Sequence, residues 1–388
     1  MKVIESVWIA LLSLPVCFFS VEATSSVERE QQRESYNNVK FFGRFHMAFP
    51  VGGTAYDTRS GELDIADLNL GAYATITNNV SLFVRLTAKR HSGQLTAANV
   101  FLNIKAVDKL IFSLGQMKSR FSMDDSITAD HSLFDDHRIS VSQWEGFLSS
   151  GIGLMGKYVA ENFGLLVGRF GNSISDDPST TEKETISQRY YLNPYRDSDK
   201  ILHLGINRIH FRDHKSSNLL DRFGLEFAVN YSVLNLQIEK KYRNFLESNM
   251  LSFLSRNFFS SDAKKNMEKN REVVKYNESF YIQLNISLTG ESLEYKNGLF
   301  ESINVRRPFG KSNGFGAFSL AFRFVEYDLW MPKREYREYA VGLNWIPTNN
   351  MRFSLQYSYL DNELNAAAKA NGGSGKGNLV SLKWKLFF

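Results

Sequence analysis

The chain has 388 residues, of which 43% are hydrophobic, and it carries a formal net charge of +5 at pH 7. Its mean hydropathy is −0.28, and no internal segment stays apolar over the length that a membrane-spanning helix needs. The excess of positive charge is mild for this length, so nucleic acid is not an expected partner. These numbers exclude a helical membrane protein, but they leave room for strands that are apolar on one face only.

Residues 1–23 have the features of a secretory signal peptide. Lys2 supplies a positive start, Val7–Ser20 is an apolar run too short to span a membrane comfortably, and small residues precede the expected cleavage site. The only cysteine, Cys17, lies in this segment, so the mature chain is expected to form no disulfide. Residues 24–38 are polar and charged, and we predict that they form a lead-in to the folded part.

From residue 39 onward, apolar and polar side chains alternate, which is typical of strands with two different faces. Within 318–324, for example, four apolar side chains alternate with Ser319, Ala321 and Arg323. No comparable run has the periodicity of a helix. The alternatives are a secreted β-sandwich and a β-helix, whose strands also alternate. The series here continues through the whole mature chain, whereas a sandwich domain has about seven to nine strands. The pattern therefore favours one large closed sheet.

The connections between these strands alternate in length. Short ones lie near 77–79, 106–108, 160–162, 196–199, 231–232 and 347–350. Long polar ones lie at 50–65, 90–97, 118–148, 171–184, 212–221, 244–274, 328–335 and 361–377. Sixteen strands joined in this way are typical of an outer-membrane barrel. We predict that residues 39–388 form an all-β, 16-stranded antiparallel transmembrane β-barrel; the link 290–312 is an exception, since it is long yet lies on the short-turn side.

The final strand, 378–388, has one apolar face that includes Trp384 and Phe388 and one face that carries Lys383 and Lys385. Ends of soluble chains usually fray into water, so an apolar last strand needs a partner. We predict that it closes the barrel by pairing with the first strand, near 40–49.

Basic residues outnumber acidic ones on the polar faces of the predicted strands, which favours a positively charged lumen and a preference for anions. Some of these side chains could instead lie at the rims of the barrel. The residues predicted to line the pore and bind anions are Arg44, Arg85, Lys89, Lys118, Arg120, Arg138, Arg323, Arg352 and Lys383.

The loop 118–148 is rich in both signs of charge, and we predict that it folds into the lumen and narrows the pore. Its acidic residues are predicted to face the basic wall; they include Asp124, Asp125, Asp135 and Asp136. A solvated external loop is an alternative for part of it. A metal or acid–base site is a weaker alternative, because the histidines and aspartates do not follow a metal-binding spacing.

Several stretches resemble the phosphate-selective porin O/P family: FYIQLNISLTGESLEYKNGLF at 280–300, NGFGAFSLAFRFVEYDL at 313–329, YYLNPYRDSDKILHLGI at 190–206 and SLGQMKSRFSMDD at 113–125. The resemblance implies a sixteen-stranded, trimeric outer-membrane porin in which 118–148 is the inward loop and the long link 290–312 is a family feature. It also implies arginines along the lumen, with Arg323 at a matching strand position. The aspartates of the loop depart from a purely cationic constriction, so the resemblance does not fix phosphate as the substrate.

The resulting hypothesis is a passive channel of the Gram-negative outer membrane for small hydrophilic solutes, with a preference for anions and with phosphate as the leading candidate. Its expected partners are membrane lipid, small anions and two further copies of the chain. No cofactor, metal or catalytic residue is expected. The alternatives are a barrel enzyme and a surface adhesin that uses its long loops, especially 244–274. Charge reversal of Arg323 and Arg352 is expected to reduce the anion preference.

Overall fold

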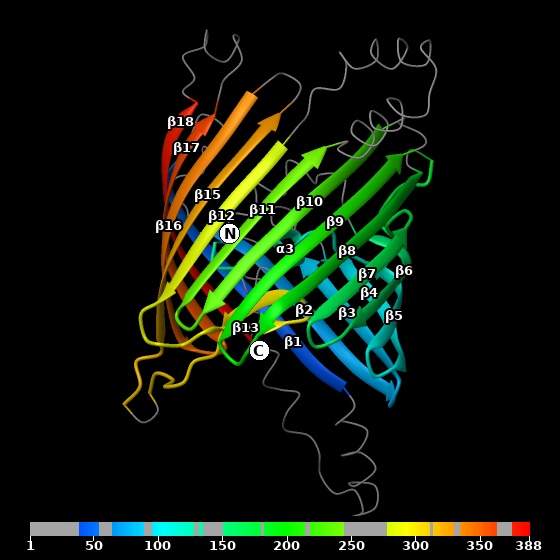
Figure 1. Cartoon of the computed structure of the whole chain (residues 1–388), viewed down its shortest axis with the longest axis horizontal. Coiled ribbons are helices and arrows are strands. Elements are labelled where there is room, and N and C mark those ends of the chain that lie inside the picture. Colours follow the sequence, from blue (N-terminus) through cyan, green and yellow to red (C-terminus); the bar gives the residue numbers. More distant parts are fainter. Residues whose placement is uncertain are drawn as a thin grey trace, which may run out of the picture.

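The computed structural model describes residues 39–53, 64–88, 95–127, 132–134, 150–179, 182–213, 218–243, 278–310, 313–329, 334–362 and 375–388. Sixteen strands in these ranges form one closed barrel (Figure 1). Among the described residues, no helix is long and apolar enough to cross a membrane. The predicted signal peptide, 1–23, and the lead-in, 24–38, lie outside the described residues.

The barrel strands are β1 (Val39–Gly53), β2 (Asp64–Thr77), β3 (Val80–Ala88), β4 (Leu95–Val107), β5 (Leu110–Met117), β6 (Gly151–Val159), β7 (Phe163–Phe170), β8 (Lys183–Arg196), β9 (Lys200–Asp213), β10 (Asn218–Tyr231), β11 (Leu234–Arg243), β12 (Glu278–Ser287), β15 (Ala317–Leu329), β16 (Arg334–Thr348), β17 (Met351–Asn362) and β18 (Lys376–Phe387). The other elements are the helix α3 (Met123–Ser126) and the two-stranded sheet β13 (Leu293–Lys296) and β14 (Leu299–Ile303).

Every barrel strand pairs antiparallel with its neighbour in the chain, except that β12 pairs with β15 and β18 returns to β1. The short turns and the long link between β12 and β15 join strands at one end of the barrel, the turn end, and the other long connections join them at the opposite end, the loop end. The predicted fold class is confirmed. Alternation of side chains explains it, because a closed sheet needs one face toward the lumen and one toward the surroundings.

The barrel closes between β1 and β18, as predicted from the last strand. The amide of Gly43 donates to the carbonyl oxygen of Phe388 over 2.8 Å, and the amide of Phe388 donates back to Gly43 over 3.2 Å. The ring of Phe388 lies where a side chain on Gly43 would be, so glycine is the residue that lets this ring cover the junction. Closure leaves the sheet without a free edge.

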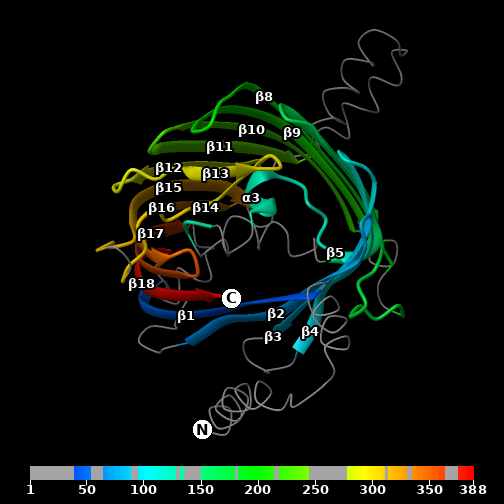
Figure 2. The same cartoon turned by 90° about the horizontal axis from the view of Figure 1, so that it is seen from below.

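Two segments enter the barrel from opposite ends. The start of the loop after β5, including α3, enters from the loop end, and the β13–β14 hairpin enters from the turn end (Figure 2). They meet in an apolar cluster that contains Met123 and Phe134 of the loop and Phe300 and Ile303 of the hairpin. Small side chains on the wall make room for them: Ala228, Ala317, Ala321 and Ala340. The link after β12 is thus an inward hairpin, which spacing alone did not predict.

Candidate functional site

A cavity of about 690 Å³ lies inside the barrel against β1–β6. Side chains from all six strands line it, together with the start of the inward loop. The opposite wall, formed largely by β10–β12 and β15–β16, is covered by the apolar cluster of loop and hairpin (Figure 2). The open part of the lumen is therefore displaced toward β1–β6.

Positive charge dominates this cavity. Among its described lining residues, the basic ones are Arg44, Arg85, Lys105, Lys118, Arg120 and Lys157. The acidic one is Asp125, whose carboxylate forms an ion pair with Lys118. A cleft with low-dielectric walls and one sign of charge raises the local concentration of counter-ions, so this arrangement attracts anions.

The first turn of the inward loop places Lys118 and Arg120 beside the wall cations. Burial, together with repulsion from Arg189 and Arg85, lowers the pKa of Arg120 below its ordinary value. The charge of Asp125 opposes this shift. Burial is the largest cause of the lowered pKa, and the neighbouring arginines add to it.

The loop is fixed to the far wall through α3. Ser122 begins this helix and accepts a hydrogen bond from the amide of Asp125 over 3.2 Å. The carboxylate of Asp124 forms a buried ion pair with Arg323 of β15 over 3.2 Å. The Asp124 amide donates to the Glu239 carboxylate of β11, also over 3.2 Å. Breaking one side of a buried ion pair costs about 3–5 kcal/mol, so this contact is a strong anchor.

A second anchor holds the loop farther along. Arg352 of β17 donates from Nη1 to the carbonyl oxygen of Ser132 over 2.7 Å. Two residues on, the ring of Phe134 lies 3.2 Å from the position of a Cβ on Gly342. The ring and the small residue fit together on the wall, and Arg323 and Arg352 thereby hold two points of the same loop.

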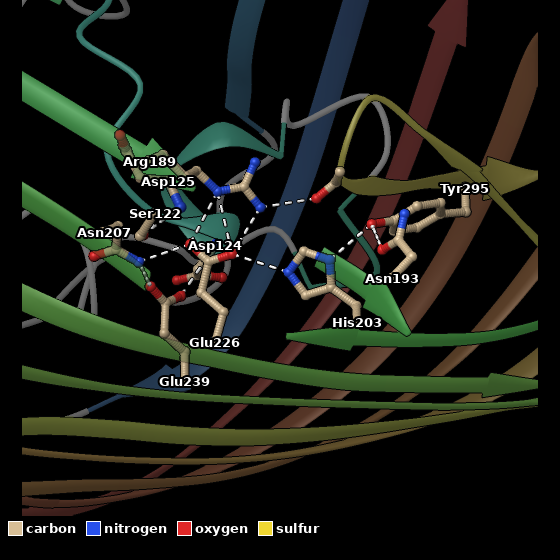
Figure 3. A network of polar contacts seen from close by, with 11 residues as sticks. Ser122, Asp124, Asp125, Arg189, Asn193, His203, Asn207, Glu226, Glu239 and Tyr295 are labelled. Carbon is tan, nitrogen blue, oxygen red and sulfur yellow. Dashed lines mark hydrogen bonds and ion pairs between the residues drawn. The ribbon is translucent and has the colours of Figure 1, made fainter. Parts of the chain in front are cut away.

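A buried polar network holds the hairpin (Figure 3). Arg189 of β8 forms an ion pair with Glu226 of β10 over 2.7 Å and donates to the carbonyl oxygen of Gly298, at the hairpin tip, over 2.8 Å. His203 of β9 lies 3.1 Å from Glu226 and 2.7 Å from the hydroxyl of Tyr295 in β13. The charged side chains are almost fully buried.

The network continues to the loop. Asn207 donates from Nδ2 to Glu226 over 2.6 Å and to Glu239 over 3.3 Å, and Glu239 accepts from the Asp124 amide. Tyr295 donates to the amide oxygen of Asn193 over 2.6 Å, and burial is the largest cause of its raised pKa. One chain of contacts thus connects hairpin, wall and loop, so the two inward segments are positioned together.

The predicted site residues fall into three groups. Arg44, Arg85, Lys118 and Arg120 line the cavity. Arg323, Arg352, Asp124 and Asp125 hold the loop, and Lys383 is buried on the wall, where it donates to Gln356 over 3.0 Å. Lys89, Asp135, Asp136 and Arg138 lie outside the described residues. The role of all of them in binding anions stays a prediction.

Sequence analysis missed Arg189, His203 and Tyr295. Thr185, Ser187, Arg189 and Asn193 lie along the buried face of β8, and this alternation is the signal in the sequence that could have identified Arg189. Tyr295 belongs to the hairpin, whose inward course has no signal in spacing. Within the described ranges, no group of His, Asp and Glu side chains is arranged to hold a metal ion.

The family model of phosphate-selective porin O and P matches residues 39–388. No curated protein matches the sequence. Among solved structures, an anion-selective porin from Comamonas acidovorans is 12% identical, with 90% of this chain and 99% of that chain covered and a TM-score of 0.57.

Two further solved structures have the same fold. The high-pH structure of OprB from Pseudomonas putida is 10% identical, with 95% and 100% of the two chains covered and a TM-score of 0.57. The trimer form of OmpT from Vibrio cholerae is 12% identical, with 90% and 99% covered and a TM-score of 0.51. At these identities, the likeness establishes the fold alone.

Proposed function

Since this chain belongs to the family of phosphate-selective porins O and P and is an outer-membrane porin of a Gram-negative bacterium, we propose that it passes small hydrophilic solutes passively, with a preference for anions. Solutes move down their gradient through sites that bind well enough to admit them and weakly enough to release them. The proposal needs no cofactor and no catalytic step. It also includes removal of residues 1–23 on export.

The observation that carries the proposal is the charge of the open cavity. Among its described lining residues, six are basic and one, Asp125, is acidic; Asp125 is paired with Lys118, and Lys105 is paired with Asp108 outside the cavity lining. Arg323 and Arg352 contribute less directly, because both contact the inward loop. Anion preference is thus supported by the wall of β1–β6 rather than by the whole lumen.

Neutralising two wall cations is expected to reduce the anion preference. In planar bilayers under a KCl gradient, the wild-type reversal potential should show chloride selectivity. The double variant Arg44→Gln, Arg85→Gln should lower the chloride-to-potassium permeability ratio roughly tenfold, because the local potential that gathers anions falls. The matched control is Arg169→Gln on the outward face, where the side chain is 76% exposed. An unchanged ratio in the double variant, or a cation-selective wild type, would contradict the proposal.

Phosphate is the leading specific candidate, on the strength of the family description. Loop-held Asp124 and Asp125 lie near the cations and would repel a multivalent anion. Block of the chloride current by added phosphate tests the point. Block at millimolar phosphate supports a phosphate site, and a current unchanged by phosphate points to other anions.

We further propose that the chain forms a homotrimer through the outward face of β1–β6. On the outward face of β7–β12 and β15–β18, ion pairs link strands that are joined at the loop end. The described pairs are Arg169–Glu184, Arg208–Asp221, Lys240–Glu278, Glu326–Arg337 and Asp361–Lys376. The described outward positions of β1–β6 carry no charged side chain, and they include Ala72 and Ala74. An uncharged face with small residues suits contact with a second copy of the chain.

A charge placed on this face is expected to break the trimer. Leu82→Arg in β3 should run as a monomer in mild detergent, because an arginine in an apolar contact lacks solvation. Leu284→Arg, on the outward face of β12, carries the same change where lipid is expected and should remain trimeric. Sedimentation or cross-linking measures both variants. Dissociation of both, or of Leu284→Arg alone, would place the interface elsewhere.

A further inference from the structure

Three phenylalanines stack in a row on the lumen wall beside the cations. The rings of Phe42 and Phe83 have centroids 5.2 Å apart with planes 25° from parallel, and those of Phe83 and Phe101 are 5.0 Å and 24° apart. The residues come from β1, β3 and β4, and all three side chains are half-buried. The row runs around the wall rather than along the pore.

Glycine makes the row possible. Phe42 and Arg85 flank Gly71 of β2 in register, and a Cβ on Gly71 would overlap the ring of Phe42. The Phe42 ring therefore lies over β2 and reaches Phe83 on the next strand. A second glycine, Gly115 of β5, lies opposite Phe101 in register. The local sequence thus builds a continuous aromatic surface where four neighbouring strands would otherwise present separate side chains.

This surface adjoins the positive charge. Phe83 and Phe101 line the same cavity as Arg44 and Arg85. The guanidinium carbon of Arg85 lies 5.5 Å from the ring centroid of Phe83 and 5.7 Å from that of Phe42. Arg85 thus lies over two of the three rings, so the aromatic surface and the positive charge are contiguous on this part of the wall.

An apolar surface in a water-filled lumen has a cost, because its hydration is unfavourable. The neighbouring lumen positions are polar, as Ser81, Asn99, Asn103 and Ser113 show. A strongly hydrated inorganic anion gains little from the rings. An organic anion gains from both parts of the wall, because its apolar group is removed from water by the rings while its carboxylate lies near the arginines.

We infer that Phe42, Phe83 and Phe101, with Arg85 and Arg44, form a binding site for small organic anions that carry a ring or another apolar group next to a carboxylate. The inference rests on the proposed anion channel and names a substrate class for its cavity. Asp125, the carboxylate that lines the same cavity, is paired with Lys118 and so opposes such an anion less than an isolated carboxylate would.

Block of the chloride current by benzoate, compared with acetate, tests the site in bilayers that contain the full-length mature porin. Both anions carry one carboxylate, and only benzoate has a ring. Half-block by benzoate is expected at a concentration about tenfold lower than by acetate, which corresponds to about 1.4 kcal/mol. Equal half-blocking concentrations in the wild type would overturn the inference, whatever the variants show.

The variants locate the effect. Phe83→Asn with Phe101→Asn removes two rings and should bring the benzoate and acetate values within about twofold of each other. Phe83→Tyr keeps the ring at the same position and should keep most of the difference. A benzoate preference that survives the double change would overturn the assignment to this row.

The reversal potential, measured on the same channels, separates the two proposals. If the channel is selective for chloride but does not distinguish benzoate from acetate, the proposed aromatic site is wrong and the proposed anion channel stands. If the channel is selective for cations, both proposals are wrong.

Discussion

Arg323→Gln is expected to raise the single-channel conductance and to weaken anion preference at the same time. The change leaves Asp124 buried without its ion-pair partner, which costs about 3–5 kcal/mol and favours release of the inward loop. Conductance histograms in symmetrical KCl measure the first effect, and the reversal potential measures the second. The conservative variant Arg323→Lys keeps the charge beside Asp124 and should remain close to wild type.

A second variant distinguishes anchoring from direct action on anions. Adding Asp124→Asn to Arg323→Gln removes both charges and should recover part of the loop's stability, because no unpaired charge then remains buried. A conductance equal to wild type, with only the anion preference reduced, would instead mean that Arg323 acts as a pore-lining cation. That result would favour the role that sequence analysis predicted.

Gly298→Ala is expected to dislodge the tip of the β13–β14 hairpin. A Cβ at this position would lie 2.5 Å from the ring of Tyr191, and the backbone has φ +81°, which favours glycine. Overpacking costs about 1–3 kcal/mol, and the tip also loses its bond to Arg189 if it moves away. Trypsin cleavage after Lys296, which lies in the hairpin, should become faster and can be followed by mass spectrometry.

Gly290→Ala is the matched control for this change. Gly290 lies in the same link with φ +94°, and a Cβ there would meet no atom within 4 Å. Both variants carry the backbone strain of a non-glycine residue, about 1–2 kcal/mol, and only Gly298→Ala adds the collision with Tyr191. Equal cleavage rates in the two variants would show that the fit of the tip against Tyr191 does not hold the hairpin.

Much of the barrel could be predicted from sequence, because the alternation of apolar and polar residues, with a period of two, identifies each strand and its two faces. The turns near 77–79, 106–108 and 347–350 follow from that period and lie where they were expected. The same period predicts that Arg44 and Arg85 face the lumen, and both side chains line the cavity. These predictions depend only on the order of residues within a short segment of the chain.

Partners across the lumen could not be predicted in the same way. Sequence analysis placed Arg323 on the wall and Asp124 in the loop, but it had no means of pairing two residues that are 199 positions apart. The turn Asn297-Gly298 has the composition of a tight hairpin, yet its inward course depends on Arg189, 109 positions away. Such contacts are set by how the segments pack inside the closed barrel.

The off-centre position of the open cavity has a consequence for three chains acting together. It lies against β1–β6, the wall whose outer side is the proposed contact between copies. The three permeation routes of the trimer would then run near its central axis. At about 0.01 M salt the Debye length is about 30 Å, so the three cation clusters would share one electrostatic field; at about 1 M it is about 3 Å, and each would act alone. At low salt the anion selectivity would thus depend on the charges of all three chains, and at high salt it would depend on the charges of each chain alone.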